Sequence, residues 1–136
     1  MRKYYKAAST ILVMGFILFW IIWTEYKAQI IKKNFILTTG KIDGITKETY
    51  KNKSKSVKYS YEVNGITYNG ENGINPCKDM SEANLRALLV NQSFFIAYQK
   101  TDVKNSSIII SQEEAEIYKC KLTDIQKHID SVIFCR

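Results

Sequence analysis

The sequence predicts an α+β protein in which an N-terminal transmembrane helix precedes a small antiparallel β-sheet domain with a short helix and a long C-terminal amphipathic helix. Three observations support this fold class: an uncharged apolar segment over 7–23, alternating apolar and polar residues over 57–69, and helical apolar spacing over 111–132. The 136 residues therefore divide into a membrane anchor and stalk over 1–33, a β-rich domain over 34–110 and the C-terminal helix over 111–136.

The net charge of +7 is unevenly distributed. Residues 1–41 hold seven basic groups and one acid, an excess of +6, whereas residues 42–136 hold thirteen basic and twelve acidic groups, an excess of +1. A domain that binds nucleic acid through phosphate contacts needs clustered lysine and arginine. Because the excess flanks the apolar segment instead, we expect no nucleic-acid partner.

The apolar segment over 7–23 is interpreted as an uncleaved membrane anchor. Seventeen helical residues span about 25 Å, close to a hydrocarbon core of about 30 Å. A cleaved signal peptide is the alternative, but no small-residue cleavage site ends the run, and a buried core helix would need a larger domain around it. Aromatic and basic residues typical of a membrane interface flank the segment: Arg2, Lys3, Tyr4, Tyr5, Lys6, Trp20, Trp23, Tyr26 and Lys27.

The orientation of this anchor follows from the length of the tail that precedes it. Basic residues balance on the two sides, so the positive-inside rule gives no answer. A short N-terminal tail favours the cytoplasm, with the C-terminal domain outside. The sequence thus predicts a single-pass protein of the cell (inner) membrane, whose partners are the lipid bilayer and a protein partner or further copies of the chain.

After the anchor the periodicity changes from helix to strand. Residues 24–35 keep helical spacing and predict a stalk. Residues 35–46 alternate and are rich in β-branched side chains, which predicts a strand with a break at Gly40 or Gly44. The polar, lysine-rich residues 47–56 predict a solvated hairpin loop.

The clearest local signal is a β-hairpin over 57–69. Alternating residues surround Asn64-Gly65, a dipeptide that suits a type I′ turn because both central residues need positive φ. Tyr59, Tyr61 and Tyr68 offer an aromatic face that could stack nucleic-acid bases. Without a local excess of basic charge, a half-buried sheet face is the preferred interpretation.

The remaining elements of the β-rich domain are shorter. Asp79 and Glu82 have the spacing of a capping box that opens a helix. With the hairpin and the first strand, the apolar runs give four or five antiparallel strands. The predicted segments are a loop over 70–78, a helix over about 80–90, a strand over 94–98, a turn over 99–105 and a strand over 107–110.

The predicted C-terminal helix opens at a second capping box, formed by Ser111 and Glu114. Apolar residues then recur in steps of three and four, so one stripe packs on the sheet or against a partner helix, with core packing the commoner outcome. The possible partner surface on this helix is Tyr118, Leu122, Ile125, Ile129 and Val132.

Few groups in the sequence are suited to catalysis. His128 is the single histidine and falls on the polar face of the predicted C-terminal helix. No phosphate-binding glycine loop, nucleophile elbow or metalloprotease motif is present. Glu113, Glu114 and Glu116 suit the positive end of the helix dipole. We therefore expect no catalytic residue, no metal site and no cofactor.

The three cysteines, Cys77, Cys120 and Cys135, lack the spacing of a zinc site. On one continuous helix Cys120 and Cys135 would lie about 22 Å apart, too far for a disulfide. In an oxidising compartment Cys77 could pair with either of them; elsewhere all three would act as small hydrophobic residues. A reactive thiolate needs a nearby base or a helix N-terminus, and His128 would lie about 12 Å from Cys120.

Several segments match a known pattern: Gly40-Lys41-Ile42, VKYSYEVNGITY over 57–68 with Gly70, Ile96-Ala97-Tyr98, and Ser106 to Ile109. In this order they resemble a bacterial domain-of-unknown-function family of small membrane proteins, with a hydrophobic helix, a G-x-V strand, a V-x-Y-x-Y-x-V-x-G-x-x-Y hairpin and a V-x-Y-D-P closing strand. Gln99-Lys100 replaces the Asp-Pro element, and the C-terminal helix is extra. The resemblance implies a small β-rich domain tethered to a membrane and no particular activity.

These observations favour a non-catalytic binding or assembly module, in contact through the C-terminal helix or an exposed sheet edge. One alternative is a membrane-anchored immunity protein that neutralises a toxin. A second is a thiol or redox protein that uses Cys77 and Cys120.

Overall fold

The computed structural model describes residues 2–46, 55–78 and 80–136, and in the first helix the side chains of residues 13–26, 29, 32 and 33. Five strands in these residues confirm the predicted antiparallel sheet. In chain order the elements are α1 (Arg2–Lys33), β1 (Phe35–Thr46), β2 (Lys55–Val63), β3 (Ile66–Ile74), α2 (Glu82–Leu89), β4 (Ser93–Gln99), β5 (Asp102–Ile109), α3 (Gln112–Ile117) and α4 (Asp124–Phe134).

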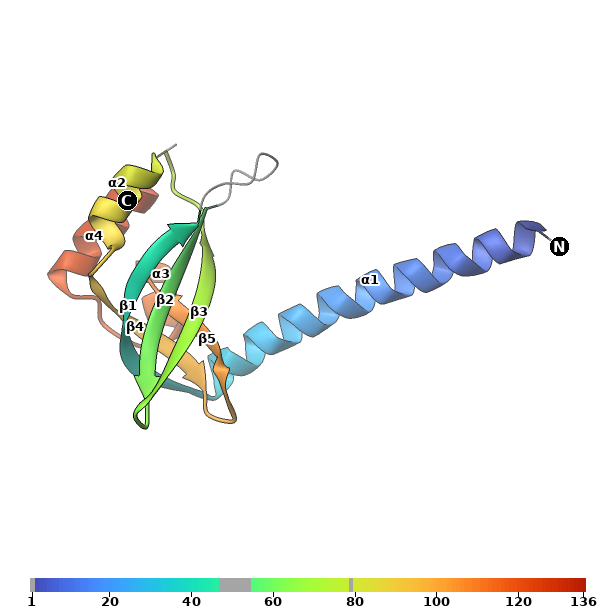
Figure 1. Cartoon of the computed structure of the whole chain (residues 1–136), viewed down its shortest axis with the longest axis horizontal. Helices are drawn as coiled ribbons and strands as arrows, with labels where there is room; N and C mark the ends of the chain where they lie inside the picture. Colours follow the sequence, from blue (N-terminus) through green and yellow to red (C-terminus); the bar gives the residue numbers. More distant parts are fainter. Residues whose placement is uncertain (1, 47–54, 79) are drawn as a thin grey trace.

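The sheet has the strand order β3-β2-β1-β4-β5 and curls until its edge strands β3 and β5 face each other across a gap (Figure 1). Side chains bridge the gap: the Asn72 amide donates to the Ser107 hydroxyl at 3.2 Å, and the Tyr59 and Ser106 hydroxyls lie 3.1 Å apart. Around this incomplete barrel the order is β1-β2-β3-β5-β4, with α2 between β3 and β4. This connectivity is that of the OB-fold, a partly open five-stranded barrel, and a shared connectivity assigns no function.

The predicted hairpin forms the β2–β3 pair. Asn64 and Gly65 have φ of 54° and 76°, as a type I′ turn requires, and Val63 pairs with Ile66 across the turn. Buried and exposed residues alternate along β2. β1 runs through Gly40 and Gly44 without the predicted break, although its register shifts between Ile42 and Gly44.

Tyrosine rings fill the inside of the barrel. Tyr61 stacks on Tyr68 and Tyr98, with ring centroids 5.9 and 6.1 Å apart. The Tyr59 ring lies against Gly70, where an added Cβ would be less than 3 Å from the ring. The Tyr59 hydroxyl donates to Asn72 Oδ1 at 2.9 Å, and burial raises the pKa of Tyr59 to about 12. Tyr59 and Tyr61 are buried and Tyr68 is partly buried, so the preferred interpretation of these tyrosines as a half-buried sheet face is confirmed.

The C-terminal helices pack on the sheet and close its core. Ile129 and Ile133 of α4 join the main core with Leu85 and Leu89 of α2. A disulfide between Cys77 and Cys135, with Cα atoms 5.9 Å apart, ties the segment after β3 to the end of α4.

The prediction of a transmembrane helix is corrected by the structure. In the described part of the chain, no helix is long and apolar enough to cross a membrane. The uncharged run over 7–23 has seventeen residues, at the short end of the roughly 20 apolar residues typical of a spanning helix. Flanking aromatic residues, typical of a membrane interface, do not lengthen the apolar run itself.

The prediction of one long C-terminal helix is also wrong, because the chain turns between α3 and α4. Lys119 adopts a left-handed conformation with φ of 52°. Its N–H bonds to the Glu116 carbonyl at 3.2 Å, and the Cys120 N–H bonds to the Ala115 carbonyl at 3.0 Å, which together form a Schellman motif that ends α3. A new capping box at Thr123 and Gln126 then opens α4.

Smaller corrections concern element boundaries. Residues predicted as a loop over 70–78 instead continue β3 to Ile74, and β5 begins earlier than predicted, at Asp102. The N-cap of α2 is Ser81, whose hydroxyl accepts from the Asn84 N–H at 3.2 Å. Asp79 and most of the loop predicted over 47–56 lie outside the described residues.

Candidate functional site: a groove between β3 and α3

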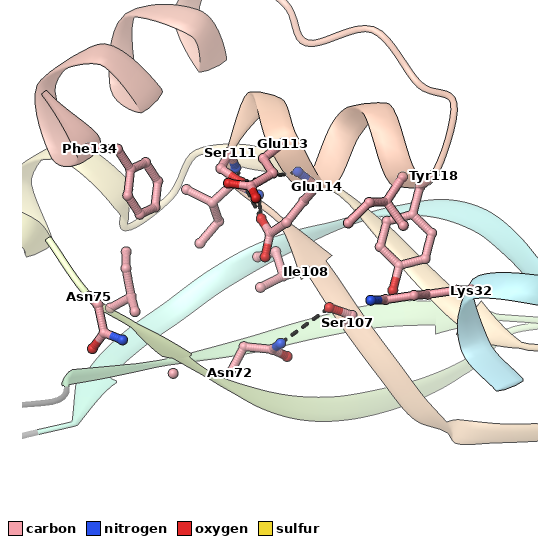
Figure 2. Close-up of a pocket in the computed structure, with 14 residues that line it drawn as sticks. Lys32, Asn72, Asn75, Ser107, Ile108, Ser111, Glu113, Glu114, Tyr118 and Phe134 are labelled. Atoms are coloured by element: carbon pink, nitrogen blue, oxygen red, sulfur yellow. Dashed lines mark hydrogen bonds between the residues drawn. The ribbon is translucent and has the colours of Figure 1, made fainter. Parts of the chain in front are cut away.

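A groove with a volume of about 410 Å³ opens at the gap of the barrel. The end of β3 forms one wall, α3 forms the other, and β5 lies between them (Figure 2). Lys32 of α1 marks one end of the groove and Phe134 of α4 the other. Ligand pockets commonly enclose about 300–1,000 Å³, so the groove is large enough for a small ligand. Its polar side chains include Asn72, Asn75, Ser107, Ser111, Glu113, Glu114 and Tyr118.

The wall formed by β3 presents backbone groups to the groove. Within an antiparallel pair, residues alternate between those that bond to the partner strand and those that point away. Because the two-residue turn makes Val63 and Ile66 a bonded pair, Gly73, opposite Ser56, is in a non-bonded pair. Its N–H and C=O therefore point away from β2, toward the open edge. An added Cβ at Gly73 would meet no atom within 4 Å, so the space where its side chain would lie is open.

A side chain of α3 covers the backbone just beyond the end of β5. Glu114 Oε2 accepts from the N–H groups of Ile110 and Ser111, at 2.9 and 3.0 Å. The Ser111 hydroxyl in turn accepts from the Glu114 N–H at 3.2 Å, which completes the predicted capping box. The carboxylate thus satisfies the amide that follows β5 and the amide of the helix N-cap together. Of the two edges, the one at Gly73 is the open one.

Charge in the groove is compensated on one side only. Glu113 pairs with Arg136 at 2.9 Å, and Glu114 is held in the cap. Lys32 is exposed and forms no ion pair with the residues that the structure describes. Lys32 and Tyr118 lie at the same end of the groove (Figure 2). The groove therefore favours a ligand that brings a negative charge to the Lys32 end.

Tyr118 stays neutral at physiological pH. Burial, first of all, and the nearby Glu114 carboxylate raise the pKa of its hydroxyl, while a hydrogen bond with Ser107 lowers it. The ring packs edge-on against Phe35, with centroids 5.1 Å apart. Tyr118 is therefore a fixed hydrogen-bonding group on the groove wall and no base.

Groups suited to chemical catalysis lie elsewhere or are occupied. His128 is exposed on α4 and does not line the groove. Cys120 is the remaining thiol, and burial raises its pKa, which disfavours the thiolate. No group of three or more metal-ligating side chains occurs among the described residues. The arrangement supports binding through backbone edges, hydroxyls and one ammonium group.

The residues predicted from sequence as contact sites lie in two other regions. Trp20, Trp23 and Tyr26 are exposed on α1. The side chains of Arg2, Lys3, Tyr4, Tyr5, Lys6 and Lys27 fall outside those that the structure describes.

The possible partner surface on the predicted C-terminal helix is divided by the turn between α3 and α4. Tyr118, Leu122 and Ile129 are buried, at 5%, 5% and 3% exposure. Ile125 and Val132 are exposed, at 62% and 37%. Three of the five residues thus pack in the core, and the groove contains Tyr118 alone of this set.

Sequence reasoning did not identify the groove. Gly73 fell in a segment predicted as a loop, and Lys32 was assigned to a stalk. One signal was present, because Ser111 and Glu114 have the spacing of a capping box and were predicted to form one. That spacing could not reveal that Glu114 also bonds to Ile110, or that β3 lies opposite.

Comparison of the chain with protein-family models, with curated proteins and with solved structures finds no match. The resemblance to the bacterial membrane-protein family therefore stays a prediction. The groove has to be interpreted from its own chemistry.

Proposed function

We propose that the protein is a non-catalytic binding module whose groove holds a short extended peptide segment with a carboxylate at the Lys32 end. The observation that carries this proposal is the open edge at Gly73, where backbone N–H and C=O groups face an empty groove. Extended peptides bind such edges by adding a strand, so that the main chain supplies the hydrogen bonds. A glycine at that position lets another backbone approach closely.

The rest of the groove fits the same ligand. The amide that follows β5 is already satisfied by Glu114, so an incoming strand pairs with β3. The Lys32 ammonium group can bind the carboxylate of the ligand, because charge-assisted hydrogen bonds are stronger than neutral ones. At the opposite end Phe134, Ile74 and Ile110 provide an apolar surface for a side chain. A toxin segment is one source of such a peptide, and the toxin-neutralising hypothesis stays a prediction.

The disulfide supports a location for this activity. Disulfides persist in oxidising compartments and are rare where thiols are kept reduced. The bond between Cys77 and Cys135 joins residues 58 positions apart and secures α4, which supplies Phe134 to the groove. We therefore propose that the domain acts in an oxidising compartment.

The test uses the full chain and two probes, acetyl-Val-Thr-Val with a free C-terminal carboxylate and the same tripeptide as its amide. Amide chemical shifts are recorded in an NMR titration. We expect the free acid to shift the Gly73 amide and to bind at least about tenfold more tightly than the amide. Lys32→Gln should remove that difference, whereas Lys33→Gln, an exposed neighbour outside the groove, should keep it.

A second variant tests the backbone contact separately. Gly73→Pro removes an N–H that faces away from β2, a change that an edge strand tolerates. It should weaken both probes alike while the unfolding temperature stays near that of the wild type. Equal affinity for acid and amide, or shifts confined to residues outside the groove, would contradict the proposal.

A further inference from the structure

A second surface, unrelated to the groove, lies on α1. The helix projects from the barrel and touches it near Lys33, at its C-terminal end (Figure 1). Every residue from Val13 to Trp23 except Gly15 is a large hydrophobic residue with 48–67% of its surface exposed. Contiguous apolar patches on monomeric proteins rarely exceed a few hundred Å², and larger ones mark interaction sites.

The exposed area is sufficient for a stable protein interface. Ten large hydrophobic side chains, each about half to two-thirds exposed, present roughly 1,000 Å² of apolar surface at about 100 Å² each. A standard interface buries about 800 Å² on each partner. Aromatic rings add to it, since Phe16 lies against Trp20 and Phe19 stacks on Trp23, with centroids 6.4 and 6.0 Å apart.

The distribution of this surface indicates the kind of partner. Consecutive helical residues point about 100° apart, so an unbroken apolar run faces every side of the helix. One partner helix covers a single stripe, whereas a helix that is apolar all round has neighbours on several sides. Other copies of the same chain supply such neighbours in a closed symmetric assembly. We infer that three or more copies of this protein assemble through a bundle of their α1 helices, which leaves the barrels outside it.

The experiment is sedimentation equilibrium of the full chain in aqueous buffer, with and without phosphatidylcholine vesicles. The expected mass is at least three times the 15.8 kDa of one chain. Both tryptophans of the protein, Trp20 and Trp23, lie on α1. Their emission should therefore shift to longer wavelength on dilution, in parallel with the fall in mass.

Two variants distinguish assembly through this surface from non-specific aggregation. Ile17→Glu places a charge in the apolar run and should reduce the mass to that of one chain. Ile125→Glu places the same charge on α4, at a residue that is 62% exposed, and should leave the assembly unchanged. A wild-type chain with the mass of a monomer or dimer would overturn the inference. So would recovery of the chain with the vesicles in place of the oligomer.

Discussion

Replacing Cys77 and Cys135 together by serine tests the cross-link that secures α4. The bond closes a loop between residues 58 positions apart. In the chain-entropy model, a loop of that length stabilises the folded state by about 4 kcal/mol, because it restricts the unfolded chain. Domains of this size are stable by about 5–15 kcal/mol, so the double variant should lose a large part of its stability.

The assay is urea unfolding of the full chain, followed by the near-ultraviolet circular dichroism of tyrosine. Tyrosine is the suitable reporter because Tyr59 and Tyr61 are inside the barrel, whereas both tryptophans are on α1. The slope of the unfolding free energy against urea should rise in the variant, since the released chain exposes more surface. Cys120→Ser, which changes the remaining thiol, is the matched control and should alter stability by less than about 1 kcal/mol.

Two results would refute this reasoning. A double variant within about 1 kcal/mol of the wild type would show that the cross-link does not constrain the unfolded chain. A wild-type protein whose unfolding curve is unchanged by reducing agent would show that the bond is absent in solution. Either result would also remove the support for an oxidising compartment.

Three further predictions concern single side chains. Burial raises the pKa of Tyr59 from 10.0 to about 12. The stabilisation that goes with this shift is present below pH 10 and is lost as the pH rises from 10 to 12. The free energy of unfolding, measured in urea, should therefore fall by about 2–3 kcal/mol over that range. Tyr59→Phe should remove the loss, and an unchanged alkaline transition would contradict the assignment. Gly70→Ala should lower the unfolding free energy by about 1–3 kcal/mol, because its Cβ meets the Tyr59 ring. Gly73→Ala, with nothing within 4 Å, is its control, and equal costs would argue against the packing. Thr123→Ala should cost about 1 kcal/mol in thermal unfolding, because it removes the cap of α4. Thr123→Ser should keep that cap. An alanine variant with the thermal stability of the wild type would contradict the role of Thr123 as a cap.

Local patterns predicted those elements whose causes are local. The first strand has the predicted bounds, Phe35–Thr46, because β-branched residues are frequent along it. Asn64-Gly65 specified the hairpin, since few other dipeptides adopt two positive φ angles. Ser111 and Glu114 form their predicted capping box because the two residues lie within one turn of the helix and bond to each other's backbone.

The errors arose where the deciding feature is unusual or distant in sequence. A Schellman turn usually has glycine in the left-handed position, and here Lys119 occupies it, so the apolar stripe looked continuous. The second capping box, Thr123 with Gln126, was visible in the sequence and marks the start of α4. The apolar run over 7–23 suggested a membrane span from composition, although its length is at the short end for a spanning helix.

The groove shows how a local signal acquires a role from its surroundings. The capping box at Ser111 begins α3 directly after β5, so the chain leaves the sheet there and no longer lies beside β3. Glu114 then satisfies the amide of Ile110, which would otherwise have needed a partner strand. Among the described residues no side chain caps Gly73 in this way, and the position of its missing Cβ is open, so the two places differ. A peptide that binds here would compete with nothing on β3 and with a carboxylate on β5, and this asymmetry predicts pairing with Gly73.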